Sequence, residues 1–172
     1  MNEAAVRQCR WREPGGIDAA LQIGAFLEAI GIELEAAAAG DSRLPGMTVF
    51  RGRVRIDPGV AAYPGDLLHE AGHLAVCDPA TRASLERIEP DPGDEMAAIA
   101  WSVAAAHACG IALDVLFFDD GYLGAAGAFR DNFAANRTLG VPMLAWFGMT
   151  AEPHRAAEWD MPAFPAMTRW LR

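Results

Sequence analysis

The spacing of apolar residues along the chain predicts a mainly helical protein with a little strand. Apolar side chains recur at helical intervals from Ile17 to Ile30, and Gly31 would end that helix. Residues 32–38 favour a short strand, and the alternating residues 48–57 favour another. Helices are also expected at 66–77, 94–109, 113–118, 123–136 and 141–147, with a loop or short helix at 80–88 and a closing segment at 162–171. This order of elements predicts an α+β fold, with a small sheet beside a mainly helical body.

One stretch raises the question of a membrane span. Residues 96–113 contain no Asp, Glu, Lys or Arg, and eighteen such residues approach the length that crosses a bilayer. The stretch is rich in alanine, however, and it includes Ser102, His107 and Gly110. A helix that is covered by protein on all sides has this composition, so we expect the central core helix here and no membrane segment.

Length, charge and cysteine content limit the domain number, the partners and the location that we expect. The 172 residues suffice for one domain with a real core, so we expect a single domain over 1–172. A formal net charge of −9 disfavours binding to nucleic acid or to an anionic membrane surface. The three cysteines form no paired pattern, and residues 1–11 lack the apolar core of a secretory signal. Together these features favour free thiols and a cytoplasmic location. Composition does not specify an oligomeric state.

Residues 69–73 form the most informative segment, His69-Glu70-Ala71-Gly72-His73. On a helix, residues four apart lie about 6 Å apart along one face, so both imidazoles can point at one ion. Glu70 lies next to the first histidine and remains free to take a proton from a metal-activated water. The flanking residues are apolar, and ionisable groups in an apolar helix need a reason. The alternative is a core helix whose histidines only form hydrogen bonds.

A zinc site needs a third protein ligand. A third histidine six positions after His73 is excluded, because Pro79 occupies that position, and Cys9 lies sixty residues upstream without a supporting motif. Glu95 suits the role best, since it lies 22 residues after His73 at the start of the long helix. A Pro-Gly-Asp sequence precedes both helices, as expected where a helix begins. The alternative third ligands are the neighbouring Asp94 and the downstream Asp119 and Asp120.

These residues carry a resemblance to a known family. The histidine segment resembles the H-E-x-x-H zinc metallopeptidases, or zincins, with a glutamate third ligand. Over about residues 45–110 the chain looks most like the compact bacterial ImmA/IrrE-type metallopeptidases, with a short strand at 53–57 and a glutamate helix beginning at 95. The resemblance implies a small zincin-like fold and hydrolysis of peptide or protein substrates. It also implies Zn²⁺ bound by His69, His73 and Glu95, with Glu70 as the catalytic base.

The chain departs from the family pattern in two respects. A polar residue is expected four positions after the third ligand, to hold a ligating histidine, but Ile99 stands there. Ser102, one helical turn later on the same face, is the candidate substitute. A DNA-binding helical module, which accompanies some members of the group, is not recognisable here, so a regulatory role is not carried over.

Further residues are candidates for contact with a substrate. Tyr122 is the candidate catalytic donor to the oxygen on which charge develops, and His154 is a second one. In zincins an edge strand commonly receives the substrate as an added strand. The alternation over 48–57 would place Arg51, Arg53 and Arg55 on one strand face, which suggests a preference for acidic substrates or simply a solvated face.

Three classes of function follow. The first is a zinc-dependent peptidase. The second is a catalytically weak or inactive zincin-fold protein that acts as a regulatory or protein-binding module. The third is a metal-free helical binding module that uses the aromatic residues of the C-terminal region, namely Trp146, Phe147, Trp159, Phe164 and Trp170.

Overall fold

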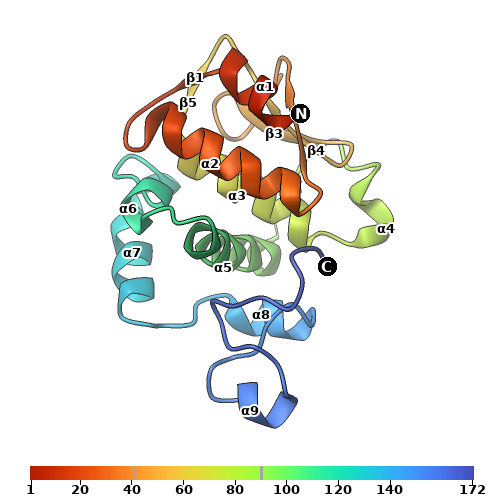
Figure 1. Ribbon diagram of the computed structural model, residues 1–172, viewed down its shortest axis with the longest axis vertical. Coiled ribbons are helices and arrows are strands. Elements are labelled where there is room, and N and C mark those ends of the chain that lie inside the picture. Colours follow the sequence, from red (N-terminus) through yellow and green to blue (C-terminus); the bar gives the residue numbers. More distant parts are fainter. Residues whose placement is uncertain (41, 90) are drawn as a thin grey trace.

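Three helices are stacked across the middle of the protein. The computed structural model describes residues 1–40, 42–89 and 91–172 and has an α+β fold. Figure 1 shows α2 (Gly16–Ala29), α3 (Pro64–Val76) and α5 (Pro92–Ala108) in succession, with the strands on one side of the stack and α8 and α9 on the other. The shorter helices are α1 (Asn2–Gln8), α4 (Pro79–Arg82), α6 (Leu113–Leu116), α7 (Ala126–Ala134), α8 (Val141–Trp146) and α9 (Ala156–Trp159).

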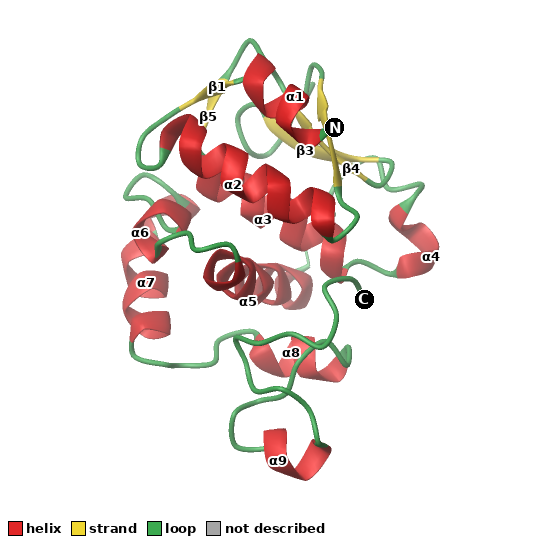
Figure 2. Ribbon diagram, in the orientation of Figure 1, coloured by secondary structure: helices red, strands yellow, loops and turns green. Residues whose placement is uncertain are grey.

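The strands lie together at one side of the helices (Figure 2). In the three-stranded sheet, β4 (Arg53–Ile56) lies between β2 (Glu33–Ala36), to which it is parallel, and β3 (Met47–Phe50), to which it is antiparallel. A second pair joins β1 (Arg10–Trp11) to β5 (Ala61–Ala62). β3 is therefore an edge strand, and it also packs against α3.

The single strand expected over 48–57 is wrong, because this segment is a hairpin. Arg51 and Gly52 form a two-residue turn between β3 and β4, with φ values of 50° and 81°. Positive φ at both central residues matches the right-handed twist of a hairpin, and glycine adopts it without a steric penalty. The turn breaks the alternation, so Arg51 does not share a strand face with Arg53 and Arg55.

The central helix α3 is enclosed. All thirteen of its residues are buried, including the polar side chains of Asp66, His69, Glu70 and His73. It approaches α5 closely at Gly72, where an added Cβ would lie 2.7 Å from the carbonyl oxygen of Ala98. A residue without a side chain therefore sets the distance between the two helices.

The alanine-rich helix α5 is a core helix, as the sequence predicts. Its residues from Ala97 to Ala106 are all buried. The segment 162–171 closes over it as expected, since Trp101 Nε1 donates a hydrogen bond of 2.9 Å to the carbonyl of Trp170. Among the described residues, no helix combines the length and apolar character that a membrane crossing requires.

The predicted helix boundaries are shifted by a few residues. Both α3 and α5 begin two residues before the predicted start, because their prolines occupy the first turn. At α5 the cap is Asp91, whose carboxylate accepts hydrogen bonds from the backbone N–H groups of Gly93 and Asp94. The helix expected over 123–136 begins only at residue 126, because Tyr122 and Leu123 have positive φ values of 55° and 54°. Helices α1 and α9 are not among the predicted elements.

Replacement of Gly72 by alanine should separate α3 from α5. We expect the G72A variant to lose about 2 kcal/mol or more of stability in urea unfolding, because backbone atoms of α5 occupy the space of the new methyl group. Gly127 in α7 is the control, since an added Cβ there meets nothing within 4 Å among the described residues. The G127A variant should stay within about 1 kcal/mol of the parent protein. Equal effects of the two substitutions would contradict this role of Gly72.

Candidate metal centre

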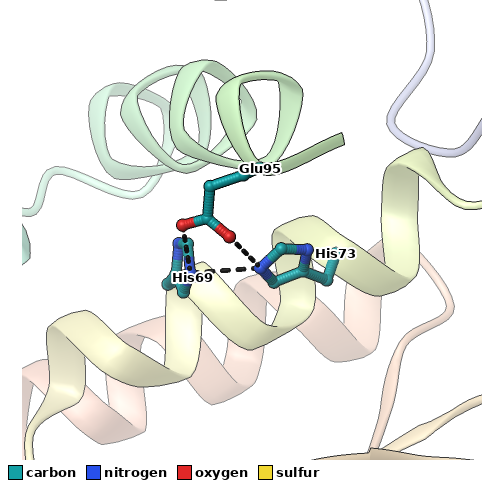
Figure 3. Close-up of side chains that lie close together, drawn as sticks. All are labelled: His69, His73 and Glu95. Atoms are coloured by element: carbon teal, nitrogen blue, oxygen red, sulfur yellow. Dashed lines mark hydrogen bonds and ion pairs between the residues drawn. The ribbon is translucent and has the colours of Figure 1, made fainter. Parts of the chain in front are cut away.

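Three side chains from α3 and α5 converge on one point. His69 Nε2 lies 3.1 Å from His73 Nε2, and the carboxylate oxygens of Glu95 lie 3.3 Å and 3.2 Å from these two nitrogens. Figure 3 shows Glu95 reaching from α5 toward both imidazoles. The two histidines stand one turn apart on α3, and the close approach of the helices at Gly72 brings Glu95 within reach.

These separations suit a bound metal ion. A tetrahedral ion with bonds of about 2.0–2.1 Å holds its ligand atoms about 3.3 Å apart. The three observed separations, 3.1, 3.2 and 3.3 Å, are close to that value. Within residues 1–40, 42–89 and 91–172, His69, His73 and Glu95 are the one group of three such side chains that could hold a metal ion. The alternative ligands Asp94, Asp119 and Asp120 lie outside this group.

The surroundings favour the protonation states that a metal requires. Burial lowers the pKa of His69, which favours the neutral imidazole. Hydrogen bonds with His69 and His73 lower the pKa of Glu95, which favours the carboxylate. Neutral imidazoles and an ionised carboxylate are the forms that donate electron pairs to a metal ion.

The candidate centre lines a pocket of about 920 Å³. Glu70 lines the same pocket, is only 6% exposed and lies outside the converging group. Burial raises the pKa of its carboxyl to about 7, while the nearby His73 opposes the rise. A carboxyl with a pKa near neutrality can both take up and release a proton at physiological pH. The structure therefore places the predicted base beside the predicted ligands.

Tyr122 reaches the pocket and His154 does not. The Tyr122 ring meets the His69 ring edge-on at 5.3 Å between centroids, and its hydroxyl is buried without a hydrogen-bond partner among the described residues. Burial raises the pKa of Tyr122 well above 10, so the hydroxyl keeps its proton and remains a donor. His154 is exposed, outside the residues that line the pocket.

Ser102 does not replace the missing polar residue at position 99. Its hydroxyl lies 2.7 Å from the carbonyl oxygen of Ala98 and 3.1 Å from that of Leu68, and its one proton serves either oxygen. Ser102 therefore links α3 to α5 through the backbone. His69 Nδ1 is buried and has no hydrogen-bond partner in the part of the chain that the structure describes.

The arginines expected to select acidic substrates are engaged elsewhere. Each forms an ion pair of 2.7 Å with a glutamate: Arg51 with Glu86, Arg53 with Glu33 and Arg55 with Glu35. The strand that carries Arg53 and Arg55 is also the central one, so it presents no free edge. Among the described residues, the arginines that line the pocket are Arg12, Arg43 and Arg87.

Asp66 is a pocket residue that sequence reasoning misses. It occupies the first turn of α3, where an aspartate needs no further explanation, yet it is 9% exposed and lines the pocket. Burial, assisted by the nearby Glu70, raises the pKa of Asp66 to about 7. The available signal is its spacing, because positions 66, 69, 70 and 73 share one face of the helix.

The C-terminal aromatic residues form only a small exposed surface. Trp146 is 83% exposed, whereas Phe147 is 8% exposed and Trp170 packs edge-on against Phe26.

Comparison of the chain with protein-family models, curated proteins and solved structures finds no match. Functional inference therefore starts from the candidate metal centre and its pocket.

The buried Asp66 should make the metal-free protein less stable as the pH rises. The folded state holds this proton more tightly than the unfolded state, so stability falls between about pH 4 and about pH 7. Relative to the parent protein, D66N should gain about 2 kcal/mol more at about pH 8 than at about pH 5.5, measured by urea unfolding in a chelator. The control is D18N, since Asp18 holds the corresponding first-turn position of α2 but is exposed. A D66N gain that does not change with pH would contradict the expectation.

Proposed function

We propose that this protein is a zinc-dependent peptidase that hydrolyses peptide bonds. The observation that carries the proposal is the convergence of His69, His73 and Glu95 beside a buried glutamate that is not one of the three. Two imidazoles and a carboxylate are a common ligand set for catalytic zinc, which keeps one position open. Glu70 then has the position of a general base.

The arrangement of elements supports the zincin resemblance. The hairpin β3–β4 precedes the histidine helix α3, and the glutamate helix α5 follows and packs against it. We therefore extend the proposal to a zincin-like fold of the ImmA/IrrE type, with zinc as the metal. The short separations among the three ligand atoms favour zinc over larger ions such as calcium, whose bonds to oxygen are 2.3–2.6 Å long.

The pocket residues Glu70 and Tyr122 have separate roles in the proposed amide hydrolysis. A zinc ion at this centre would supply a Lewis acid that acidifies water and polarises a carbonyl group. Glu70 accepts the proton of the attacking water and passes it to the leaving amine. Tyr122 keeps its proton and offers a hydrogen bond to the carbonyl oxygen as negative charge develops there.

The edge strand β3 borders the pocket. Its residues Met47 and Thr48 line the pocket, and its side away from β4 is an edge of the sheet that Leu44 bridges at Met47. In a two-residue hairpin the backbone groups of Met47 and Val49 point away from the partner strand. The N–H of Met47 already donates a hydrogen bond of 3.2 Å to the carbonyl of Leu44, and the backbone of Val49 interacts with the carboxylate of Glu70 and lowers its pKa. An extended peptide would have to displace these contacts to pair with β3.

One observation favours a second candidate function, a catalytically weak zincin-fold protein that acts through binding. A ligating histidine usually donates its other ring N–H to a partner, and loss of that partner weakens metal binding. His69 Nδ1 has none among the described residues. A protein with this defect would bind zinc weakly and serve a regulatory or protein-binding role.

The metal content of the purified protein tests the centre. Zinc is added to the protein and the unbound excess is then removed by dialysis. Elemental analysis should find about one zinc per chain in the parent protein and none in H69A, because two ligands do not retain the ion. H107A is the control, since His107 lies on the helix that carries Glu95 but outside the converging group. A parent protein that binds no zinc, or an H69A variant that keeps it, would overturn the site.

Substitution of the base separates chemistry from metal binding. E70Q should lower kcat for a cleaved peptide by about 100-fold or more while zinc content stays unchanged, because the amide cannot accept the proton. E3Q, which changes an exposed glutamate of α1, should retain full activity. Zinc-loaded parent protein that cleaves no peptide in a diverse library would favour the second candidate function.

A further inference from the structure

Asp66 lines the pocket, and among the described residues no ion pair neutralises its carboxylate. In the described part of the chain, ion pairs within 4.0 Å engage other acidic residues but not Asp66. The residue is 9% exposed, so water provides little compensation for its charge. A buried carboxylate of this kind is stable as an anion when a cation binds to it.

We infer that Asp66 binds a positively charged amine of the substrate and so determines which peptides are cleaved. The inference rests on the proposed peptidase function, since it assigns a substrate class to the same pocket. Asp66 lies one helical turn before His69 and Glu70 on the same face of α3. An amine bound there lies within about two residues' reach of the bond that Glu70 would attack.

The first turn of α3 holds Asp66 in a fixed position. Gly65 touches α6 so closely that an added Cβ would lie 2.5 Å from the carbonyl oxygen of Val115 and 2.6 Å from that of Leu116. The backbone N–H of Asp66 donates a hydrogen bond of 3.2 Å to the carbonyl of Tyr63. A carboxylate on so constrained a backbone is preorganised, which reduces the entropy lost when a ligand binds.

Aromatic side chains line the same pocket. Tyr63 and Phe118 stack at 3.8 Å between ring centroids, and both line the pocket together with Tyr122 and Phe129. Aromatic faces attract cations and also contact the methylene groups that carry an amine. A carboxylate and aromatic rings together select for a cation on an apolar stem.

The pocket arginines do not cancel this selection. Arg12, Arg43 and Arg87 are all exposed, so water and salt screen their charges. Arg87 is also paired with Glu89 at 2.6 Å, and Arg12 lies over the Tyr63 ring. The charge with the least screening among these residues is that of Asp66.

Two parts of a peptide carry such a cation: the N-terminal ammonium group and a lysine side chain. Matched peptides distinguish them. Free and N-acetylated forms of one peptide without basic residues test the ammonium group. N-acetylated peptides with lysine or its neutral isostere norleucine, placed in turn at each position around the scissile bond, test the side chain.

The decisive measurement is kcat/KM of zinc-loaded parent protein, D66N and D18N on these peptides. We expect the parent to prefer the cationic member of one pair by about 30-fold or more, mainly through KM, and D66N to lose that preference. D18N should keep it. A second charge-removing variant, D66S, guards against a defect specific to asparagine, and thermal unfolding verifies that each variant is folded. An unchanged preference in D66N and D66S, or no preference in the parent, would overturn the inference.

A binding assay separates failure of this inference from failure of the proposed function. If the parent protein cleaves nothing, calorimetry on the zinc-loaded protein compares leucinamide with N-acetyl-leucinamide, and N-acetyl-lysinamide with N-acetyl-norleucinamide. The cationic member of one pair should bind about 30-fold or more tightly to the parent and D18N but not to D66N. Equal binding within both pairs would remove the role of Asp66 even if peptide cleavage were found.

Discussion

The contact between α3 and α5 at Gly72 controls the geometry of the whole site. The two histidines are fixed relative to one another by a single helix, but Glu95 comes from the other helix, and its distance from them depends on how closely the helices pack. Gly72 removes one side chain from the interface, and the Ser102 hydroxyl lies within hydrogen-bond distance of the Leu68 carbonyl across it. The packing of α3 against α5 therefore determines both the core contact and the separation of Glu95 from the two histidines.

The price of this arrangement is a helix with four buried polar side chains. Asp66, His69, Glu70 and His73 all lie inside the protein on α3, where hydration is lost. Such groups destabilise a fold unless they are paired or bind a ligand. The alanine and leucine residues of the same helix supply the compensating apolar burial. A fold that keeps such a stripe gives up stability at a position where a bound metal ion could restore it.

The parts of this site that depend on local spacing could be predicted from the sequence, and the parts that depend on tertiary packing could not. The positions of His69 and His73 follow from the helical period, and that of Glu95 from the start of the long helix α5. The turn at Arg51 and Gly52 was hidden, because arginine at positive φ is uncommon and the residues around it alternate as in one strand. Because the sequence favours one strand over residues 48–57, it predicts a free edge and a positively charged face for this segment. In the structure Arg53 and Arg55 lie on the central strand β4 and are paired with glutamates.

Asp66 and Tyr122 illustrate the limit differently. An aspartate in a first turn already has a local explanation, so only the packing of α3 against α6 reveals that it is buried. Tyr122, a candidate donor in the sequence, lies far from α3 along the chain, and only the tertiary structure shows that its ring contacts His69. No pattern within the segment itself predicts that contact.

The backbone conformation of Tyr122 and Leu123 limits which substitutions this turn tolerates without a change at the pocket. Leu123 holds a backbone conformation that disfavours side chains with a Cβ, and its own side chain is fully exposed, so packing provides no compensation. Glycine at this position would relax the backbone and at the same time give the neighbouring tyrosine more freedom to move. Relief of the strain at Leu123 would therefore reduce the rigidity of Tyr122.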